Sequence, residues 1–193
     1  ADMDGDGDMD VLSACWYNSE AAWHENLDGL GTFGSTNIIT TLALNVKDVY
    51  PSDLDGDGDF DVVTVSGGDN KIAWYENVDG NGTFGPQQLL GNDGDSPQAV
   101  FCADMDNDGD QDVLFASYGD HKLAWYENID GQGTFGSVQV ISTQVGNAMD
   151  IYCSDLDGDG DVDVLGASHR DGQIVWYENG EGYEPGEGLG DFG

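Results

Sequence analysis

The chain has 193 residues with 39 acidic and only four basic side chains, so its formal net charge at pH 7 is −35. Nucleic acid is excluded as a partner because phosphate binding needs clusters of lysine and arginine, and an anionic membrane surface is excluded for the same reason. No apolar run is long enough to cross a bilayer, so no membrane insertion is expected. Aromatic residues make up 10% of the chain, which indicates a folded core despite the high charge.

An internal repeat organises the chain with a period of 51 residues, because 53 − 2, 104 − 53 and 155 − 104 all equal 51. The copies open with aspartate-rich loops at Asp2, Asp53, Asp104 and Asp155. Tryptophan and asparagine keep phase in every copy, at Trp23, Trp74, Trp125 and Trp176 and at Asn26, Asn77, Asn128 and Asn179. We therefore divide residues 1–179 into units 2–52, 53–103, 104–154 and 155–179, followed by a divergent Gly/Glu-rich tail at 180–193.

Strand signals dominate each unit, because Gly, Asp and Asn interrupt every stretch that could form a helix. In the second unit, residues 60–66 and 71–77 are β-rich runs separated by a Gly-Gly-Asp-Asn turn, which predicts a hairpin. Further strands are expected at about 86–91 and 97–103. Four short strands in a unit of this length predict an all-β fold, a β-propeller with four-stranded blades. The recurring aromatic residues are expected to pack between blades, whereas Trp16 has no constant counterpart and is expected at the surface.

The end blades are expected to be incomplete. Residue 1 directly precedes the first aspartate loop, and the repeat pattern stops at Asn179, after which the tail could close or link the fold. Three arrangements stay open: a four-bladed ring, part of a longer propeller, or copies that complete one another head to tail in a ring or filament.

The loops that open the units share the pattern D-x-D-x-D-G-x-x-D. Carboxylates at this density repel one another unless a cation lies among them. Aspartates at positions 1, 3, 5 and 9 can point oxygen ligands inward, glycine at position 6 permits a sharp turn, and the residue at position 7 can offer its backbone carbonyl. Oxygen-only ligands favour Ca²⁺, one ion per unit and about four in all. The candidate metal residues are Asp2, Asp4, Asp6, Asp8, Asp10, Asp53, Asp55, Asp57, Asp59, Asp61, Asp104, Asp106, Asp108, Asp110, Asp112, Asp155, Asp157, Asp159, Asp161 and Asp163.

An EF-hand begins in the same way but needs a bidentate glutamate at position 12 and flanking helices. Position 12 is occupied by Ser13, Thr64, Phe115 and Gly166, so the EF-hand is rejected. The loop, the strand that follows it and the Phe-Gly turn instead resemble the FG-GAP/VCBS repeats of integrin-α-like β-propellers. This resemblance implies a Ca²⁺ ion between the first and second strands of each blade, a secreted or cell-surface location, and roles in adhesion or recognition. Such propellers commonly have seven blades, whereas this chain supplies about four.

No catalytic constellation is evident. A catalytic site must break the repeat symmetry, and the residues that do so, His24, His121, His169 and Arg170, occupy different phases. The three cysteines Cys15, Cys102 and Cys153 are expected to be free thiols, with their redox state left open. Asn81 lies in the glycosylation sequon Asn-Gly-Thr on an expected turn, so an attached glycan is a further candidate partner.

The sequence thus predicts a non-catalytic, extracellular, Ca²⁺-binding propeller module with a structural or adhesive role and self-association through its end blades. Two alternatives are a carbohydrate-binding, lectin-like module that uses Trp16, and an accessory domain of a larger secreted enzyme.

Overall fold

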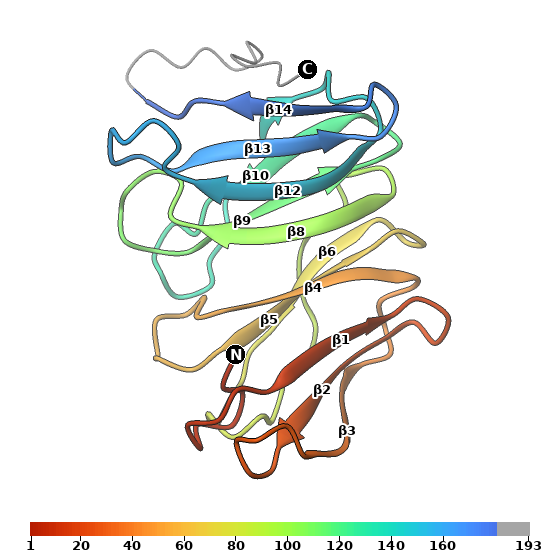
Figure 1. The fold of residues 1–193 in the computed structure, drawn as a ribbon, viewed down its shortest axis with the longest axis vertical. Coiled ribbons are helices and arrows are strands. Elements are labelled where there is room, and N and C mark those ends of the chain that lie inside the picture. The colour runs from red at the N-terminus through yellow and green to blue at the C-terminus, as the bar shows by residue number, and fades with distance from the viewer. Residues whose placement is uncertain (181–193) are drawn as a thin grey trace.

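The computed structural model describes residues 1–180, which form fourteen β-strands and no helix. The strands make four antiparallel sheets that follow one another along the chain (Figure 1). The first sheet contains β1 (Val11–Cys15), β2 (Glu20–Asn26) and β3 (Phe33–Thr40), and the second contains β4 (Val46–Ser52), β5 (Asp61–Ser66), β6 (Lys71–Tyr75) and β7 (Gln88–Gly91). The third contains β8 (Pro97–Ala103), β9 (Asp112–Ser117), β10 (Lys122–Tyr126) and β11 (Gln139–Ser142), and the fourth contains β12 (Ala148–Ser154), β13 (Asp163–Ser168) and β14 (Gln173–Tyr177).

The second, third and fourth sheets each begin with the last strand of one sequence unit and continue into the next, whereas β1–β3 lie within the first unit. Strand β4 closes the first unit but pairs with β5 of the second, from Val46 opposite Ser66 to Ser52 opposite Asp61. The aspartate loop therefore connects the first two strands of a blade. The expected runs at 60–66, 71–77, 86–91 and 97–103 correspond to β5, β6, β7 and β8, which confirms the all-β, four-stranded blade.

The four sheets stack in an open row, with β1–β3 at one end and β12–β14 at the other (Figure 1). Strands β4, β8 and β12 lie side by side along this row. The rings of Tyr50, Phe101 and Tyr152 form a column between them, with centroid distances of 4.7 and 5.0 Å. The arrangement is that of propeller blades that do not close into a ring within residues 1–180. The closing or linking strand expected from the tail lies outside the described residues.

The hydrophobic core lies between neighbouring sheets, as predicted for the aromatic residues. Trp23 and Trp74 are only 5% and 3% exposed. The Gly-Thr-Phe-Gly turn of the next unit covers each of them, since Phe135 contacts the Trp74 ring edge-on at a centroid distance of 6.4 Å. A Cβ atom on Gly133 would lie 2.5 Å from Trp74 Cζ2, so glycine is required where this turn crosses the indole.

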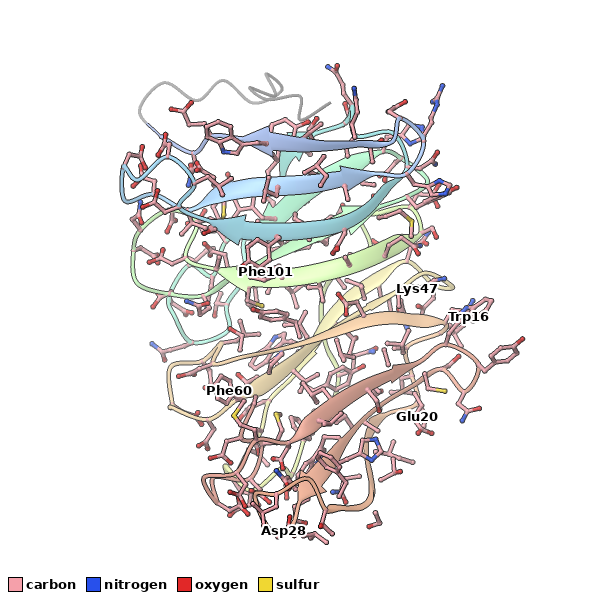
Figure 2. The ribbon with its side chains drawn as sticks, viewed as in Figure 1. Trp16, Glu20, Asp28, Lys47, Phe60 and Phe101 are labelled. Carbon is pink, nitrogen blue, oxygen red and sulfur yellow. The ribbon has the colours of Figure 1, made fainter. Side chains whose placement is uncertain are left out.

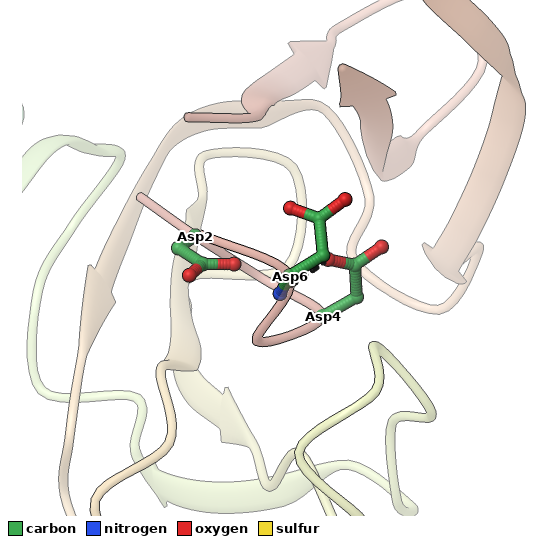
Figure 3. Close-up of side chains that lie close together, drawn as sticks. All are labelled: Asp2, Asp4 and Asp6. Atoms are coloured by element: carbon green, nitrogen blue, oxygen red, sulfur yellow. Dashed lines mark hydrogen bonds between the residues drawn. The ribbon is translucent and has the colours of Figure 1, made fainter. Parts of the chain in front are cut away.

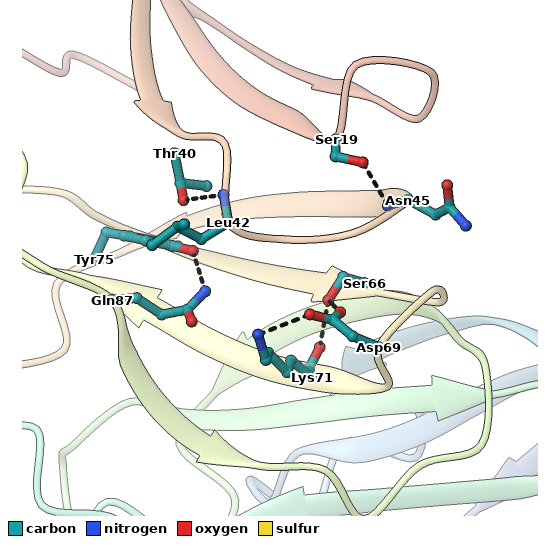
Figure 4. A network of polar contacts seen from close by, with 9 residues as sticks. All are labelled: Ser19, Thr40, Leu42, Asn45, Ser66, Asp69, Lys71, Tyr75 and Gln87. Carbon is teal, nitrogen blue, oxygen red and sulfur yellow. Dashed lines mark hydrogen bonds and ion pairs between the residues drawn. The ribbon is translucent and has the colours of Figure 1, made fainter.

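The two ends of the blades carry different charges. All four basic residues of the chain, Lys47, Lys71, Lys122 and Arg170, stand at strand starts or turns on the hairpin end. Figure 2 shows Lys47 with Trp16 at this end, opposite Asp28 and Phe60 at the loop end. The hairpin after β5 is held locally, because Asp69 accepts a hydrogen bond from Ser66 Oγ at 2.6 Å and pairs with Lys71 Nζ at 2.7 Å (Figure 4). The aspartate loops therefore have no lysine or arginine beside them.

Candidate metal centres

Carboxylates converge within each of the four aspartate loops. In the first three loops the side chains at positions 1, 3 and 5 each offer an oxygen within 4.8 Å of the others, and Figure 3 shows the first of these groups. In the fourth loop the converging side chains are at positions 1, 3 and 9. The groups are Asp2, Asp4 and Asp6; Asp53, Asp55 and Asp57; Asp104, Asp106 and Asp108; and Asp155, Asp157 and Asp163.

Backbone amides of the loop orient these carboxylates. Asp2 accepts hydrogen bonds from the amides of Gly5 at 2.9 Å and Gly7 at 3.0 Å, one on each oxygen. Asp4 Oδ1 accepts from the amide of Asp6, and Asp6 Oδ1 from the amide of Asp8. The position-6 glycine that allows this turn has a φ of +96° to +104° in the four copies, a conformation that disfavours a side chain, as the sequence predicted.

The aspartate at position 9 braces the loop against its blade. Asp61 is 1% exposed, and its two oxygens accept the amides of Leu54 at 3.0 Å and Asn77 at 2.8 Å. The same pair of bonds recurs at Asp10, Asp112 and Asp163. Burial raises the pKa of Asp61 and of Asp112 to about 7, although the two amide bonds act in the opposite direction.

The side chain at position 7 faces a neighbouring turn. A Cβ atom on Gly29 would lie 2.4 Å from Asp8 Oδ1, and Gly80 and Gly131 are equally close to Asp59 and Asp110. Asp8, Asp59, Asp110 and Asp161 are not among the converging carboxylates of the described residues. The side chain at position 7 therefore lies apart from the converging group, and the backbone-carbonyl role expected for this residue from the sequence stays a prediction.

The carboxylates at position 3 are electrostatically uncompensated. Partial burial is the largest cause that raises the pKa of Asp4, Asp55 and Asp106, and the neighbouring loop carboxylates raise it further. Since the basic residues lie at the other end of the blades, no side chain offsets this repulsion. Three converging carboxylate oxygens on a glycine turn are a donor set that suits a hard divalent cation.

The histidines that break the repeat symmetry make structural contacts within the blades. His121 Nδ1 accepts the amide of Asn147 at 2.9 Å, which is the bond that Asn70 Oδ1 makes to the amide of Ser96 in the preceding blade. His24 is hydrogen-bonded to Ser13 Oγ at 3.2 Å. His169 lies against the ring of Tyr118. The amide of His169 donates to the Asn147 carbonyl at 3.2 Å and that of Arg170 to the Gly146 carbonyl at 3.0 Å, so these two residues border the same segment as His121, whereas His24 lies in the first sheet.

Several other predicted residues are also placed. Cys15, Cys102 and Cys153 are free thiols, as expected, and burial raises the pKa of Cys102 to about 12. Asn81 is exposed on its turn. Trp16 is 53% exposed, as predicted, but the sequence did not single out its neighbour Tyr17, which is 91% exposed. Lys47 Nζ lies over the Trp16 ring at 4.9 Å from its centroid.

The repeated asparagines have a role that sequence reasoning did not assign. Asn77 Nδ2 donates to the carbonyl of Met3 in the preceding loop at 2.9 Å and to that of Phe60 in its own loop at 3.4 Å. Asn128 and Asn179 repeat this arrangement. The constant phase of a polar residue at a strand end was the available signal, because a buried amide is retained where it satisfies backbone groups.

The FG-GAP-like repeat family model matches residues 2–64, 53–115 and 104–166. The chain therefore belongs to this family, which confirms the resemblance seen in the loops and turns. Comparison with curated protein sequences gave no significant match. Among the described residues, no helix is long and apolar enough to cross a membrane.

Two solved structures have a similar fold. One is a lectin from Agrocybe aegerita, described for its specific recognition of non-reducing terminal N-acetylglucosamine, at 22% identity and a TM-score of 0.69. The other is the biofilm matrix protein Bap1 of V. cholerae, at 18% identity and a TM-score of 0.52. The similarity covers 100% and 93% of this chain, but only 51% and 26% of theirs. The chain thus spans about half the length of the lectin, and these identities indicate a shared fold alone.

Proposed function

We propose that this chain is a Ca²⁺-binding β-propeller module in which one ion occupies each aspartate loop. The observation that carries this proposal is the convergence of three carboxylates within 4.8 Å in all four loops, at the end of the blades that lacks basic residues. A single acidic cluster is common on protein surfaces, whereas four copies on the same loop frame require a shared cause. The family membership of the chain supports the same assignment.

Hydrogen bonds within the loop would orient the carboxylates that hold the ion. Amides of the loop fix one oxygen of each carboxylate at positions 3 and 5, which leaves the other oxygen available for the ion. The position-9 aspartate ties the loop to the residue two positions after the third strand of the blade, which is Asn77 after β6 in the second sheet. Bound Ca²⁺ would supply the positive charge that offsets the repulsion among these carboxylates, and four ions would change the formal charge from −35 to −27.

Isothermal titration calorimetry of the chelator-treated protein tests this assignment. We expect about four Ca²⁺ ions per chain, with weaker binding of Mg²⁺ because the site lacks a rigid octahedral set of ligands. The variant Asp55→Asn removes one ligand charge from the second loop and is expected to lose one of the four sites. Absence of binding at millimolar Ca²⁺ would refute the proposal.

We further propose that the module is non-catalytic and extracellular, that it has a structural or adhesive role, and that it associates with blades of its own kind. The histidines, which are the usual residues for acid–base catalysis at neutral pH, are engaged in structural contacts. Millimolar Ca²⁺ outside cells suits sites of the affinity found in extracellular modules. The free thiols Cys102 and Cys153 are buried, so an oxidising environment would not readily reach them.

Carbohydrate binding is the second candidate function. A groove of about 320 Å³ between the third and fourth sheets is lined by Trp125, Tyr177, Glu178 and Gln139, which combine aromatic surfaces with hydrogen-bonding groups. Trp16 and Tyr17 form a second, exposed aromatic pair at the other end of the blades. A glycan array of the wild type and of Trp125→Ala and Trp16→Ala would tell the two sites apart. Absence of binding to any glycan would remove this candidate.

A further inference from the structure

The free face of the fourth sheet exposes apolar side chains whose counterparts are buried in every other blade. Leu156 and Ile174 on this face are 44% and 50% exposed. The residues that match Leu156 are Met3, Leu54 and Met105, at 0%, 1% and 7%, and those that match Ile174 are Ala21, Ile72 and Leu123, all at 0%. The difference arises because a neighbouring sheet covers the other three blades on this side, whereas no described residue covers the fourth.

In the first sheet, the face that points away from the second sheet also exposes apolar side chains that are buried in the other blades. Val11 is 43% exposed, whereas the matching residues Val62, Val113 and Val164 are 0%, 0% and 2% exposed. Phe33 is 46% exposed, although its counterparts Phe84 and Phe135 pack against the tryptophan of the preceding sheet. This face therefore presents the groups that insert into a preceding blade elsewhere in the chain.

The first sheet also lacks the hydrogen bond by which the repeated asparagine joins each other blade to the preceding one. Asn77, Asn128 and Asn179 donate to the loop carbonyls of Met3, Leu54 and Met105 in the preceding blades, at 2.7–2.9 Å. Asn26 Nδ2 donates to Met9 of its own loop at 3.1 Å, and within residues 1–180 it meets no preceding loop. The bond from this asparagine to a preceding loop, which is made in the other three blades, is therefore missing in the first blade.

We propose that a second copy of this chain docks head to tail, with its β1–β3 sheet placed on the β12–β14 sheet in the packing that joins blades within the chain. Val11 and Phe33 of one copy then cover Leu156 and Trp176 of the other, and Asn26 reaches the Leu156 carbonyl. Two such contacts close a ring of two copies, and an angle that does not close gives a filament. The interface specifies the self-association proposed above, and it uses no metal ligand side chain.

The first sheet is more polar than the inner blades at one point of this interface. Ser13 and His24 stand where Phe115 and Tyr126 stack in the third blade. They hydrogen-bond to each other at 3.2 Å, so part of their hydrogen-bonding capacity is met before any partner arrives. The contact between copies should therefore be weaker than the joins within the chain, and its strength should depend on protein concentration.

Sedimentation velocity of the full chain at protein concentrations up to millimolar tests the proposal. The buffer contains 0.5 M salt, which screens repulsion between the negatively charged copies beyond about 4 Å. We expect association that rises with concentration. Val11→Asp blocks one face and Ile174→Asp blocks the other, and each alone should weaken association by about 30-fold or more. A mixture of the two variants should recover a one-to-one dimer and nothing larger, because each retains one intact face of opposite kind.

Leu89→Asp is the matched control. Leu89 is 57% exposed on the outer strand β7 of the second sheet, so it lies on neither of the two end sheets. This variant should associate as the wild type does. A full chain that stays monomeric at every concentration overturns the proposal; if Ile174→Asp then lowers the melting temperature, residues 181–193 rather than a second copy cover this face. A mixture that associates no better than its separate components also overturns it, because it indicates a symmetric contact between like faces.

Discussion

Each of the first three units places two aspartate-containing turns at the same end of its blade, and the two turns treat negative charge differently. In the Asp-Gly-x-Gly-Thr turn, Asp79 Oδ1 accepts the amides of Asn81 at 3.0 Å and Thr83 at 3.3 Å. The Asn81 bond is the main reason that the pKa of Asp79 is lowered. In the aspartate loop, burial and the neighbouring Asp57 instead raise the pKa of Asp55. The first turn thus offsets its negative charge with its own amide dipoles, whereas the carboxylates of the loop repel one another with no basic side chain beside them.

Removal of calcium should produce the largest difference between the two kinds of turn. If free Ca²⁺ is ten times Kd, each site stabilises the fold by about 1.4 kcal/mol, so four sites contribute about 5–6 kcal/mol. For a chain of this size, that corresponds to a fall in melting temperature of about 10–20 °C in excess EGTA. Differential scanning calorimetry would measure it, and Ca²⁺ added back should restore the transition. Melting that EGTA leaves unchanged would mean that the loops, like the other turn, are self-sufficient.

Replacement of the brace at position 9 should come next in size. Asp61→Ala leaves the buried amides of Leu54 and Asn77 without an acceptor, at a cost of about 2–6 kcal/mol. Asp61→Asn keeps one acceptor oxygen, so its loss of stability should be smaller. Urea unfolding of both variants would measure these losses, with and without Ca²⁺. A loss that appears only with Ca²⁺ present would show that Asp61 acts as a ligand and not as a brace.

Substitution of a carboxylate in the converging group should have a smaller effect that depends on calcium. Asp55→Asn preserves the oxygen that accepts the amide of Asp57 but removes the charge. We expect the stabilisation by Ca²⁺ to fall by about 1.4 kcal/mol, one site's share, while the stability in EGTA changes by less than about 0.5 kcal/mol. Urea unfolding in both conditions would measure this. A large loss in EGTA would contradict it and place Asp55 among the structural residues.

Much of the fold was predictable because the turns are marked in the sequence. Strands β5 to β8 begin and end within two residues of the runs expected at 60–66, 71–77, 86–91 and 97–103. Gly67, Gly68 and Asp69 precede Asn70, whose φ of +60° matches the preference of asparagine for this conformation. Periodicity then extended one blade to the others. The open row was not predictable, because the angle between neighbouring sheets depends on side-chain packing that a repeat pattern does not encode.

The candidate site was predictable as a loop but not residue by residue. The five aspartates of a loop are chemically identical, and their spacing does not show which carboxylate is buried. Asp61 stands apart because it begins strand β5, where both of its oxygens meet backbone amides. Asp59 stands apart because a turn from another part of the blade, at Gly80, lies against it. Both differences come from contacts with residues elsewhere in the chain. Only the folded structure therefore separates the position-9 aspartate that braces the loop, the aspartates that converge and the position-7 aspartate that faces the neighbouring turn.

Disruption of the Asp-Gly-x-Gly-Thr turn should have the smallest effect on stability. Asp79→Ala removes the acceptor for the amides of Asn81 and Thr83 at an exposed site, so we expect the melting temperature to fall by only a few degrees. The fall should be the same with Ca²⁺ and with EGTA, whereas that of Asp55→Asn should not be. Asp79→Asn, which keeps an acceptor oxygen, is the matched control and should melt close to the wild type.

The pH dependence of Asp79→Ala gives an independent check of the difference between this turn and the aspartate loops. The pKa of Asp79 is lowered in the folded state, so the stability that it contributes is present above the unfolded pKa and is lost as the pH falls through the folded pKa. In EGTA, the difference in melting temperature between wild type and Asp79→Ala should therefore hold at neutral pH and vanish in strong acid. The pKa values of the loop carboxylates Asp55 and Asp106 are raised instead, so their repulsion is relieved as the pH falls through their folded pKa values. If the difference in melting temperature between wild type and Asp79→Ala instead grows on acidification, this turn behaves like the aspartate loops and the contrast between them is wrong.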